Sequence, residues 1–338
     1  MSGDGEIERG KSISYTQFSM WKECPFRWRL NYIDGNRVKI ESINTIFGRS
    51  MHEVLQEYLT VMYKKTIPDA DALDLPKMLF ERMSANFKEA QSNGSEMSIT
   101  REEMLEFYED GLNILDWFVR NKSEYFAKRG FELVGVEVPI EWPIQNGITM
   151  FGYLDVVIRD TVLNRIKIYD FKTSHQGWNK YQKADKKKQT QLVLYKSFYA
   201  MQYKYDLKNV DVEFLVLKRK LFENVDFPQK RVQKISPASG TITTNSVLLE
   251  LKTFINSCFD KDGNYLDNAE YEKRPDTKTC KYCEFKDRPD LCDKNNPKRA
   301  AKLIVEMNAA RELHKRANEI HKTNPKLADH VIVDGDIK

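Results

Sequence analysis

Long hydrophobic runs are missing from this sequence of 338 residues. No stretch of about eighteen consecutive apolar residues occurs, so no transmembrane helix is expected. The first residues also lack the apolar core of a secretory signal peptide. We therefore expect a soluble intracellular protein with no membrane partner, in the cytoplasm, the nucleus or a mitochondrion.

A disulfide framework and a strong charge of one sign are missing as well. The five cysteines are an odd number, which favours metal ligation or packing over disulfide pairing. The net charge of +4, from 54 basic and 50 acidic residues, is too small for general polyanion binding, so any nucleic-acid surface must be local. With 41% hydrophobic and 31% charged residues, the chain is globular and long enough to bury a core without covalent staples.

The hydrophobic periodicity predicts an α/β fold whose first part is helical. Helices are followed by three strands in a meander, then a helix and a further strand, which is typical of a mixed sheet flanked by helices. We expect helices over about 14–32, 44–65, 79–90, 100–128, 184–205, 239–259 and 296–322, strands over about 131–141, 148–159, 165–173 and 210–217, and two short strands flanking 222–235.

The N-terminal residues contain a phosphate-loop pattern that lacks its structural context. Residues 5–12 match G-x-x-x-x-G-K-[ST], but no strand precedes them to present such a loop. The expected parts of the chain are a disordered leader (1–12), one large domain (13–295) with a mainly helical part (13–130), a sheet core (131–235) and a closing segment (236–295), and a basic C-terminal helix with a tail (296–338).

The predicted hairpin between the second and third strands carries the strongest chemical signal. If it is symmetric about Val162 and Leu163, Asp155 falls directly opposite Asp170. Two facing carboxylates repel each other, and Lys172 on the same face does not neutralise both. The pattern favours a divalent cation, with the lysine orienting or deprotonating water, which is hydrolytic chemistry on a phosphate. The alternative is a surface hairpin whose acids are solvated.

Two predicted helices carry polar residues beside their buried faces. His52 follows Gly48 by one turn on the helix over 44–65, where a lone histidine is more often packed or solvated than a ligand. Gln191 and Tyr195, on the helix after the hairpin, are four residues apart and therefore share a face. A glutamine beside an apolar stripe is usually an edge residue, but together with the Asp and Asp-x-Lys pattern it is no longer a common coincidence.

These segments together resemble the RecB-like branch of the PD-(D/E)XK nuclease family. The resemblance covers most of residues 12–205 and implies a restriction-endonuclease-like core with a mixed central sheet. The matching stretches, in the family's order, are Gly48-x-x-x-His52, Gly152-Tyr-Leu-Asp155, Asp170-Phe-Lys172-Thr and Gln191-Leu-Val-Leu-Tyr195. The roles that it implies are ligation of Mg²⁺ or Mn²⁺ by His52, Asp155, Asp170 and the backbone carbonyl of Phe171, activation of water by Lys172, contacts near the DNA by Gln191 and Tyr195, and a further acidic position at Glu137.

The cysteines extend the resemblance. Cys24, Cys280, Cys283 and Cys292 resemble the Cys…Cys-x-x-Cys…Cys pattern that holds a [4Fe–4S] cluster in AddB-type nucleases and related single-strand exonucleases. The last gap is longer than in that pattern, and four thiolates could also hold zinc. We expect the cluster to have a structural role, because it would close the long loop between Cys24 and Cys280 and so remove much entropy from the unfolded chain. Cys258, on an apolar helix, is expected to pack in the core.

The segment between Lys172 and Gln191 is rich in lysine and contains two aromatic residues. Beside the proposed site, such a segment can stack unpaired bases on its rings and bind phosphates through its lysines. The alternative is an ordinary solvated helix face. The residues concerned are Trp178, Lys180, Tyr181, Lys183, Lys186, Lys187 and Lys188.

The sequence therefore predicts a metal-dependent deoxyribonuclease that acts as an exonuclease on single-stranded DNA, and the resemblance favours the 5′ to 3′ direction. One alternative is an endonuclease, or a trimming nuclease that serves a partner complex. The sequence contains no helicase motor, so processive cleavage would need a ring, a protein partner or a threaded strand. Another is a nuclease-like domain that binds nucleic acid without cutting, which the intact Asp155, Asp170 and Lys172 disfavour. A nucleotide hydrolase built on residues 5–12 lacks the necessary strand.

Overall fold

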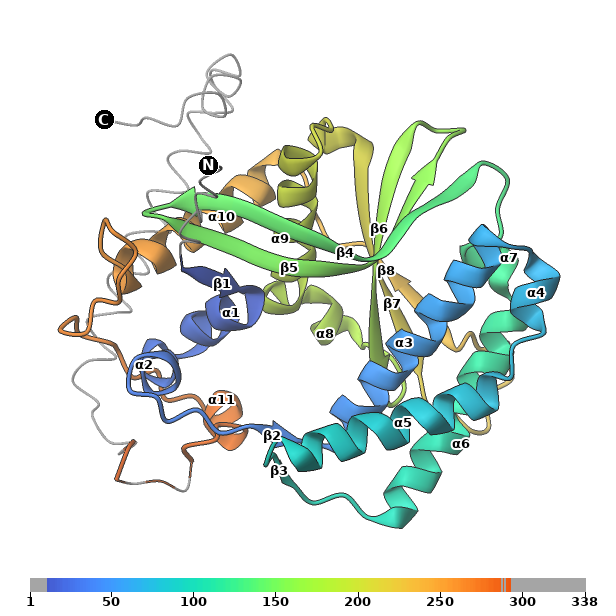
Figure 1. Cartoon of the computed structure of the whole chain (residues 1–338), viewed down its shortest axis with the longest axis horizontal. Helices are drawn as coiled ribbons and strands as arrows, with labels where there is room; N and C mark the ends of the chain where they lie inside the picture. The colour runs from blue at the N-terminus through green and yellow to red at the C-terminus, as the bar shows by residue number, and fades with distance from the viewer. Residues whose placement is uncertain (1–10, 287, 289, 293–338) are drawn as a thin grey trace, which may run out of the picture. The chain divides into compact units, whose positions relative to one another are not determined.

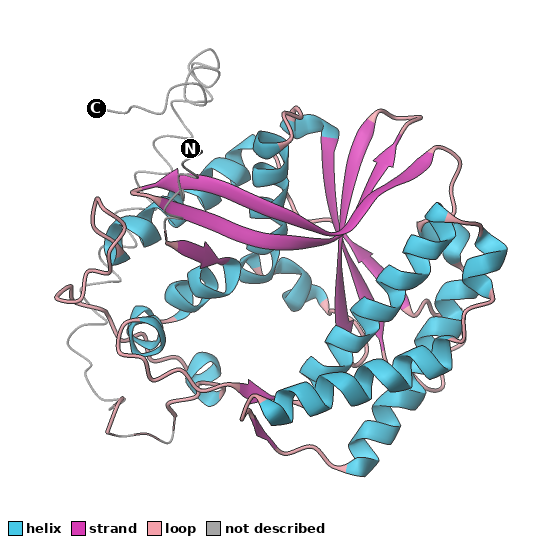
Figure 2. Cartoon of the chain, in the orientation of Figure 1, coloured by secondary structure: helices cyan, strands magenta, loops and turns pink. Residues whose placement is uncertain are grey.

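A computed structural model of the chain describes residues 11–286, 288 and 290–292. Figures 1 and 2 show a central group of strands with helices packed around it. In chain order the elements are β1 (Ser12–Ser14), α1 (Tyr15–Glu23), α2 (Pro25–Tyr32), β2 (Ile40–Glu41), α3 (Ile43–Lys64), α4 (Ile67–Asp71), α5 (Leu75–Ser92), β3 (Glu96–Met97), α6 (Arg101–Arg120), α7 (Lys122–Tyr125), β4 (Phe131–Gln145), β5 (Ile148–Asp160), β6 (Arg165–Ser174), α8 (Lys180–Ala184), α9 (Lys186–Gln202), a 3₁₀ turn (Leu207–Asn209), β7 (Val210–Lys218), β8 (Val232–Ile235), α10 (Thr241–Cys258) and α11 (Thr277–Lys281).

The chain divides into two compact units. The first consists of residues 1–22 and 28–270 and contains the sheet. The second consists of residues 23–27 and 271–338. The short segment around Cys24 therefore groups with the C-terminal segment. The predicted closure by a cluster and the predicted domain limits stay predictions.

Six strands of the first unit form a mixed sheet in the order β1-β5-β6-β7-β8, with β4 paired to β5. β4, β5 and β6 are antiparallel neighbours, as the predicted meander requires. β6 and β7 are parallel, and α8 and α9 lie between them in the chain. β8 pairs antiparallel with β7 and lies at the edge of the sheet. The predicted α/β fold with a mixed central sheet is confirmed.

β5 changes its partner along its length. Its residues 156–160 pair with β6, and its residues 149–151 pair with β1. β4 occupies the other edge of β5 throughout, so β6 and β1 share one side. Within the described strands, residues 152–155 have no ladder partner on that side. The sheet therefore has a fork between β6 and β1, and Asp155 lies in it.

Helices cover both faces of this sheet. On one face α3, α5 and α6 pack together, as Figure 1 shows, and bury a continuous apolar core. On the other face α9 contacts β4 and β7, and α10 packs against α9. Cys258 of α10 is fully buried, as predicted. The strands contribute to the first core through Val156, Ile158, Tyr169, Phe171, Leu215, Leu217 and Val232.

The helix that opens with the predicted capping box ends earlier than predicted. Thr100 and Glu103 form the box at the start of α6. The helix stops at Arg120 instead of continuing to 128, because the Asn121 amide donates a hydrogen bond to the Trp117 carbonyl oxygen at 2.7 Å. A short separate helix, α7, then begins at Lys122. Polar side chains that bond to nearby carbonyls end helices in this way.

Some predicted limits near the ends of the sheet are wrong. Ser12 belongs to β1, and the Lys11 carbonyl accepts a hydrogen bond from the Thr149 N–H at 3.1 Å, so the first strand begins two residues before the helix predicted from residue 14. Between residues 219 and 235 a single strand forms, β8, instead of two. Residues 1–10 and the basic helix predicted over 296–322 lie outside the described residues.

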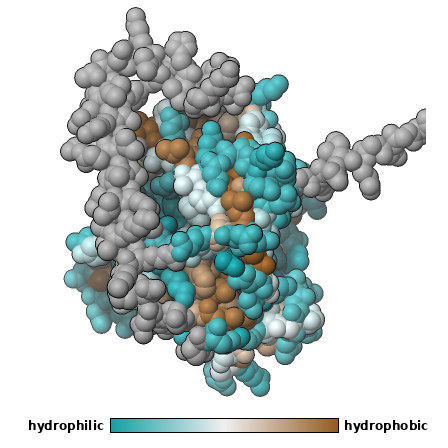
Figure 3. Space-filling view, turned by 90° about the vertical axis from the view of Figure 1, so that its left-hand side faces the viewer, coloured by the Kyte–Doolittle hydropathy of each residue, from teal (hydrophilic) through white to brown (hydrophobic). Residues whose placement is uncertain are grey.

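On the face drawn in Figure 3, hydrophilic side chains surround smaller apolar patches. No helix among the described residues is long and apolar enough to cross a membrane.

Candidate active site

Asp155 and Asp170 face each other at the fork of the sheet. The last ladder pair before the strands separate is Val156 with Tyr169, so the next residue on each strand is one of the two acids. This is the register that a hairpin centred between residues 162 and 163 predicts. Beyond the fork, the Phe171 N–H donates to Asp155 Oδ2 at 2.7 Å. A carboxylate thus takes the place of a backbone carbonyl in the ladder.

Two basic side chains flank the acids. Lys172 Nζ lies 2.7 Å from Asp170 Oδ2. His52 Nδ1 lies 3.4 Å from Asp155 Oδ2. His52 comes from the middle of α3, so the predicted helix and the predicted hairpin meet at this point. The sequence-predicted His, Asp and Asp-x-Lys residues are therefore brought together.

Burial sets the protonation states of these groups. It raises the pKa values of Asp155 and Asp170, each to about 6, against the opposing effect of Lys172. Burial alone would lower the pKa of Lys172, but Asp170 and Asp155 together raise it above its usual value. Burial and the Lys172 charge lower the pKa of His52 to about 4. At neutral pH the site thus holds two anions, one cation and a neutral imidazole.

The donor set fits a hard divalent cation. Asp170 Oδ2 is buried, and the one charged partner that the structure places against it among the described residues is the Lys172 ammonium at 2.7 Å, so a single cation faces two buried carboxylates. No group of three or more His, Cys, Asp or Glu side chains among the described residues is arranged to hold a metal ion. A cation between the two acids would therefore also need water or a backbone oxygen such as the predicted Phe171 carbonyl. Mg²⁺ binds in this way, through few carboxylates and several waters.

Gln191 and Tyr195 of α9 lie next to these charges. Gln191 Nε2 donates a hydrogen bond to Tyr195 Oη at 3.1 Å. Burial raises the pKa of Tyr195 to about 12, so its hydroxyl keeps its proton at neutral pH. Asp170 and Lys172 both act electrostatically on this hydroxyl, which shows that it borders the site. The Tyr195 hydroxyl can therefore donate to an anionic group there.

Two glycines of the matching stretches allow the close packing of the site. A Cβ at Gly48 would lie 3.4 Å from Thr173 Oγ1, so α3 and β6 approach to van der Waals contact at this glycine. A Cβ at Gly152 would lie 3.2 Å from Tyr195 Cε1. The glycine of Gly-x-x-Asp thus makes room for the tyrosine of Gln-x-x-x-Tyr.

Gly152→Ala should displace the Tyr195 ring and lower the rate of cleavage about tenfold, while stability falls by about 1 kcal/mol, as for other overpacked sites. Initial rates on a labelled single strand would measure this loss. In a Tyr195→Ala background the added methyl group meets no ring, so Gly152→Ala should have little further effect. An equal loss in both backgrounds would contradict the proposed contact.

Glu137 and Gln56 join the site, and neither has a strong sequence signal. Val136 pairs with Val156 and Val138 with Leu154, which places Glu137 beside Asp155. Gln56, one turn beyond His52 on α3, donates to Glu137 Oε1 at 2.5 Å and to the Asp155 carbonyl oxygen at 3.2 Å.

Glu137 also has an unusual backbone. Its φ of +47° lies in the left-handed region, which costs on the order of 1 kcal/mol for a residue with a side chain.

The spacing of Gly48, His52 and Gln56 along one helix face was the available sequence signal for Gln56.

The lysine-rich segment agrees only in part with its prediction. Trp178 is 7% exposed and packs on Phe214 with ring centroids 5.0 Å apart, so it cannot stack on a base as predicted. Its ring instead supports Lys188, whose Nζ lies 4.9 Å from the ring centroid. Tyr181 is 74% exposed, and Lys180 Nζ lies 5.0 Å from its ring centroid. The exposed lysines are Lys180, Lys183, Lys186, Lys187 and Lys188.

The four candidate cluster cysteines all belong to the second unit. The Cys24 thiol lies 3.9 Å from the Glu272 carbonyl oxygen, and the Cys283 N–H donates to the Cys280 carbonyl at 3.3 Å. Burial raises the pKa of the Cys283 thiol, and nearby Cys24 raises it further. In the described part of the chain, however, no three such side chains form a ligand set, Cys292 included. A preformed cluster site is therefore absent from these residues.

Comparison with known proteins adds little at the level of individual relatives. No curated protein sequence matches the chain significantly. A solved structure from Eubacterium rectale, named "Putative exonuclease", is similar to 88% of this chain and 96% of its own, with 10% identity and a TM-score of 0.45.

The comparison with protein families is decisive. The family model described as the PD-(D/E)XK nuclease superfamily matches residues 12–288, which include every residue of the site at the fork. This match supports the predicted enzyme class, a PD-(D/E)XK deoxyribonuclease, and the predicted use of a divalent metal. The chain belongs to the PD-(D/E)XK nuclease superfamily.

Proposed function

We propose that the chain is a metal-dependent deoxyribonuclease of the RecB-like branch that degrades single-stranded DNA from its ends. The observation that supports this most is the pair of buried acids at the fork, with Lys172 ion-paired to one of them at 2.7 Å. Burying two carboxylates together is unfavourable without a cation, and such perturbed groups are typical of catalytic sites.

In the proposed mechanism each side chain has one task. A divalent cation, when bound by Asp155 and Asp170, supplies Lewis-acid stabilisation of the charge on the phosphate. Lys172, kept protonated by Asp170, orients the attacking water. His52, uncharged at neutral pH, would be a further ligand of the divalent cation. Tyr195, oriented by Gln191, donates to a non-bridging phosphate oxygen.

The exonuclease reading and its direction are tested by one assay. Single strands labelled at either end, and circular strands, are incubated with the protein in Mg²⁺ or Mn²⁺. We expect labelled mononucleotides or short fragments from the 5′ end first, and intact circles. Cleavage of the circular strands would show that the protein is an endonuclease. Cleavage that occurs only after a partner complex is added would favour a trimming nuclease with a protein partner. A strand bound but never cut would support the non-catalytic alternative.

We further propose that Cys24, Cys280, Cys283 and Cys292 bind a structural [4Fe–4S] cluster, with zinc as the less favoured metal. The support is the cysteine pattern and the grouping of residues 23–27 with 271–338 in one unit. The cluster would order the second unit and take no part in cleavage.

Cys280→Ser should lose the metal and destabilise the protein by several kcal/mol, since removing a long-range cross-link of the disulfide type costs about 2–5 kcal/mol. Iron, zinc and acid-labile sulfide in the purified protein identify the metal, and thermal unfolding measures the loss. Cys258→Ser, which changes a buried cysteine outside the set, should keep the metal. Wild-type metal content and stability in Cys280→Ser would refute the cluster.

A further inference from the structure

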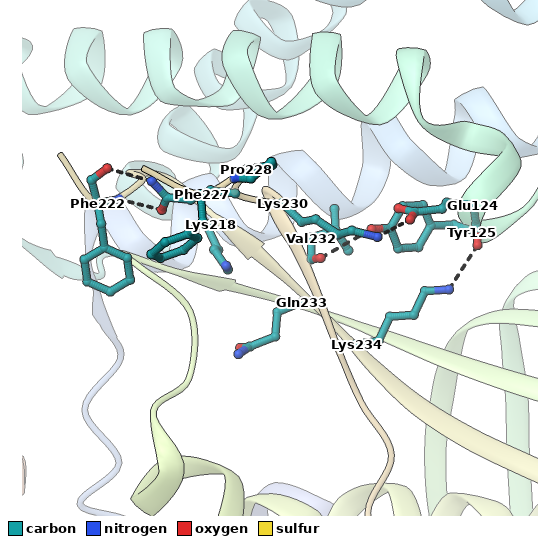
Figure 4. A pocket seen from close by; sticks show the side chains of 11 residues that line it. Glu124, Tyr125, Lys218, Phe222, Phe227, Pro228, Lys230, Val232, Gln233 and Lys234 are labelled. Atoms are coloured by element: carbon teal, nitrogen blue, oxygen red, sulfur yellow. Dashed lines mark hydrogen bonds and ion pairs between the residues drawn. The ribbon is translucent and has the colours of Figure 1, made fainter. Parts of the chain in front are cut away.

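A pocket with a volume of about 450 Å³ lies beside β8, at the edge of the sheet. Two of the residues that line it, Phe222 and Phe227, are 51% and 61% exposed. Figure 4 shows these two rings and Lys218 at one end of the pocket, and Glu124 and Lys234 at the other. Exposed rings gathered around a hollow are typical of a binding surface rather than of an ordinary soluble surface.

The charges around this pocket are unevenly paired. The Glu124 carboxylate is ion-paired with Lys230, and Lys234 donates to the Glu124 carbonyl at 3.0 Å. Lys218 has no carboxylate within ion-pair distance among the described residues, and the charged group that acts on it is another lysine, Lys183. Burial and this neighbouring ammonium lower the pKa of Lys218. The end of the pocket next to Lys218 is therefore suited to an anion.

The neighbouring strands β6, β7 and β8 connect the pocket with the active site. Lys218 pairs in register with Ser174, two residues beyond Lys172 on the parallel strand, so both lysines are on one face of the sheet. The offset along the strands is about 7 Å at roughly 3.3 Å per residue. Gln233 accepts from the Trp178 N–H at 2.8 Å and donates to its carbonyl at 3.2 Å. These bonds fasten the segment after β6 to the edge strand β8.

We propose that Lys218 and the pocket of Phe222 and Phe227 bind unpaired nucleotides of the substrate strand, beyond Lys172 and about 13 Å along the strands from Asp170. The assignment rests on the proposed nuclease function and adds a basis for choosing single strands. Phenylalanine rings stack on any base whose face is free, and the lysine neutralises a phosphate. Bases in a duplex have both faces covered, so they cannot use this surface.

Binding of a fluorescent oligothymidylate to the full-length protein in EDTA tests the proposal without requiring catalysis. The double variant Phe222→Ala/Phe227→Ala should bind about ten- to a hundredfold more weakly, as expected for lost base stacking. Replacing both rings by tyrosine should restore most of the affinity. Phe80→Ala is the matched control, because Phe80 on α5 is equally exposed, at 61%, but lies outside the pocket.

The salt dependence of oligonucleotide binding distinguishes the phosphate contact of Lys218 from base stacking on Phe222 and Phe227. Lys218→Ala should reduce the slope of log affinity against log salt by about 0.7, the value for one phosphate contact on a single strand. The phenylalanine variant should leave this slope unchanged. Circular dichroism and thermal unfolding establish that the variants are folded.

Wild-type affinity of both the phenylalanine variant and Lys218→Ala would overturn the proposal. So would an equal loss of affinity for duplex DNA, or binding of polyglutamate to the wild type as tightly as the oligonucleotide. If the wild type binds the strand through these residues but never cleaves it in Mg²⁺, the proposed function fails and the binding surface stands.

Discussion

Lys172→Ala should reduce cleavage of single-stranded DNA by about 10²–10⁴-fold, the range observed when a group that orients or transfers a proton is lost. The variant should keep its fold, because Lys172 lies at the open side of the fork and is one-third exposed. Initial rates in saturating Mg²⁺ would measure the loss. The binding of the oligonucleotide in EDTA should change far less than the rate.

Lys167→Ala is the matched control for this variant. Lys167 lies on the same strand, β6, and is also ion-paired, with Asp160 and Asp211 at the far end of the hairpin. Its loss should leave the rate nearly unchanged. A Lys172→Ala protein that cuts as fast as Lys167→Ala would remove the lysine from the mechanism.

Asp170→Asn should abolish metal-dependent cleavage and, at neutral pH, make the metal-free protein more stable than the wild type. Burial raises the pKa of Asp170 from 3.8 to about 6, so its ionised form is disfavoured in the folded chain. Asparagine resembles the protonated acid and avoids this cost, which is on the order of 3 kcal/mol at about 1.4 kcal/mol per pKa unit. Active sites commonly sacrifice stability in this sense.

The stability difference between the wild type and Asp170→Asn should depend on pH. Below about pH 4 the acid is protonated in both folded and unfolded chains, so the two proteins should differ little. As pH rises through about 6 the folded wild type must release this proton, and its stability relative to Asp170→Asn falls. His52 acts in the opposite direction, with a pKa lowered to about 4, but it is present in both proteins. Denaturant unfolding in EDTA between pH 4 and 8 measures the difference, and a wild type that gains relative stability with rising pH would contradict the account.

The central part of the site could be predicted from sequence because it depends on regular geometry. The period of two and the turn residues fixed the register of one hairpin, and the register placed Asp155 opposite Asp170. Helical periodicity placed Gln191 and Tyr195 on one face. These patterns involve neighbours along one element or across one short turn, where local physics determines the outcome.

The remaining features depend on contacts between distant segments. Trp178 looked like an exposed ring in a polar loop, but Gln233 of β8 binds its backbone and Phe214 of β7 buries its side chain. Glu137 reaches the site through a left-handed residue, which periodicity does not anticipate. β1 is three residues long and gains its stability from β5, so its sequence alone carries too little signal.

The most direct test of the central claim is one Mg²⁺ titration read out in two ways, by cleavage of a single strand and by thermal stabilisation of the protein. Both should rise with the same midpoint in the wild type, because binding to the folded state stabilises it in proportion to occupancy. The double variant Asp155→Asn/Asp170→Asn should show neither response. Undiminished cleavage by the wild type in EDTA, or equal stabilisation of the double variant by Mg²⁺, would contradict a metal-dependent nuclease centred on these two acids.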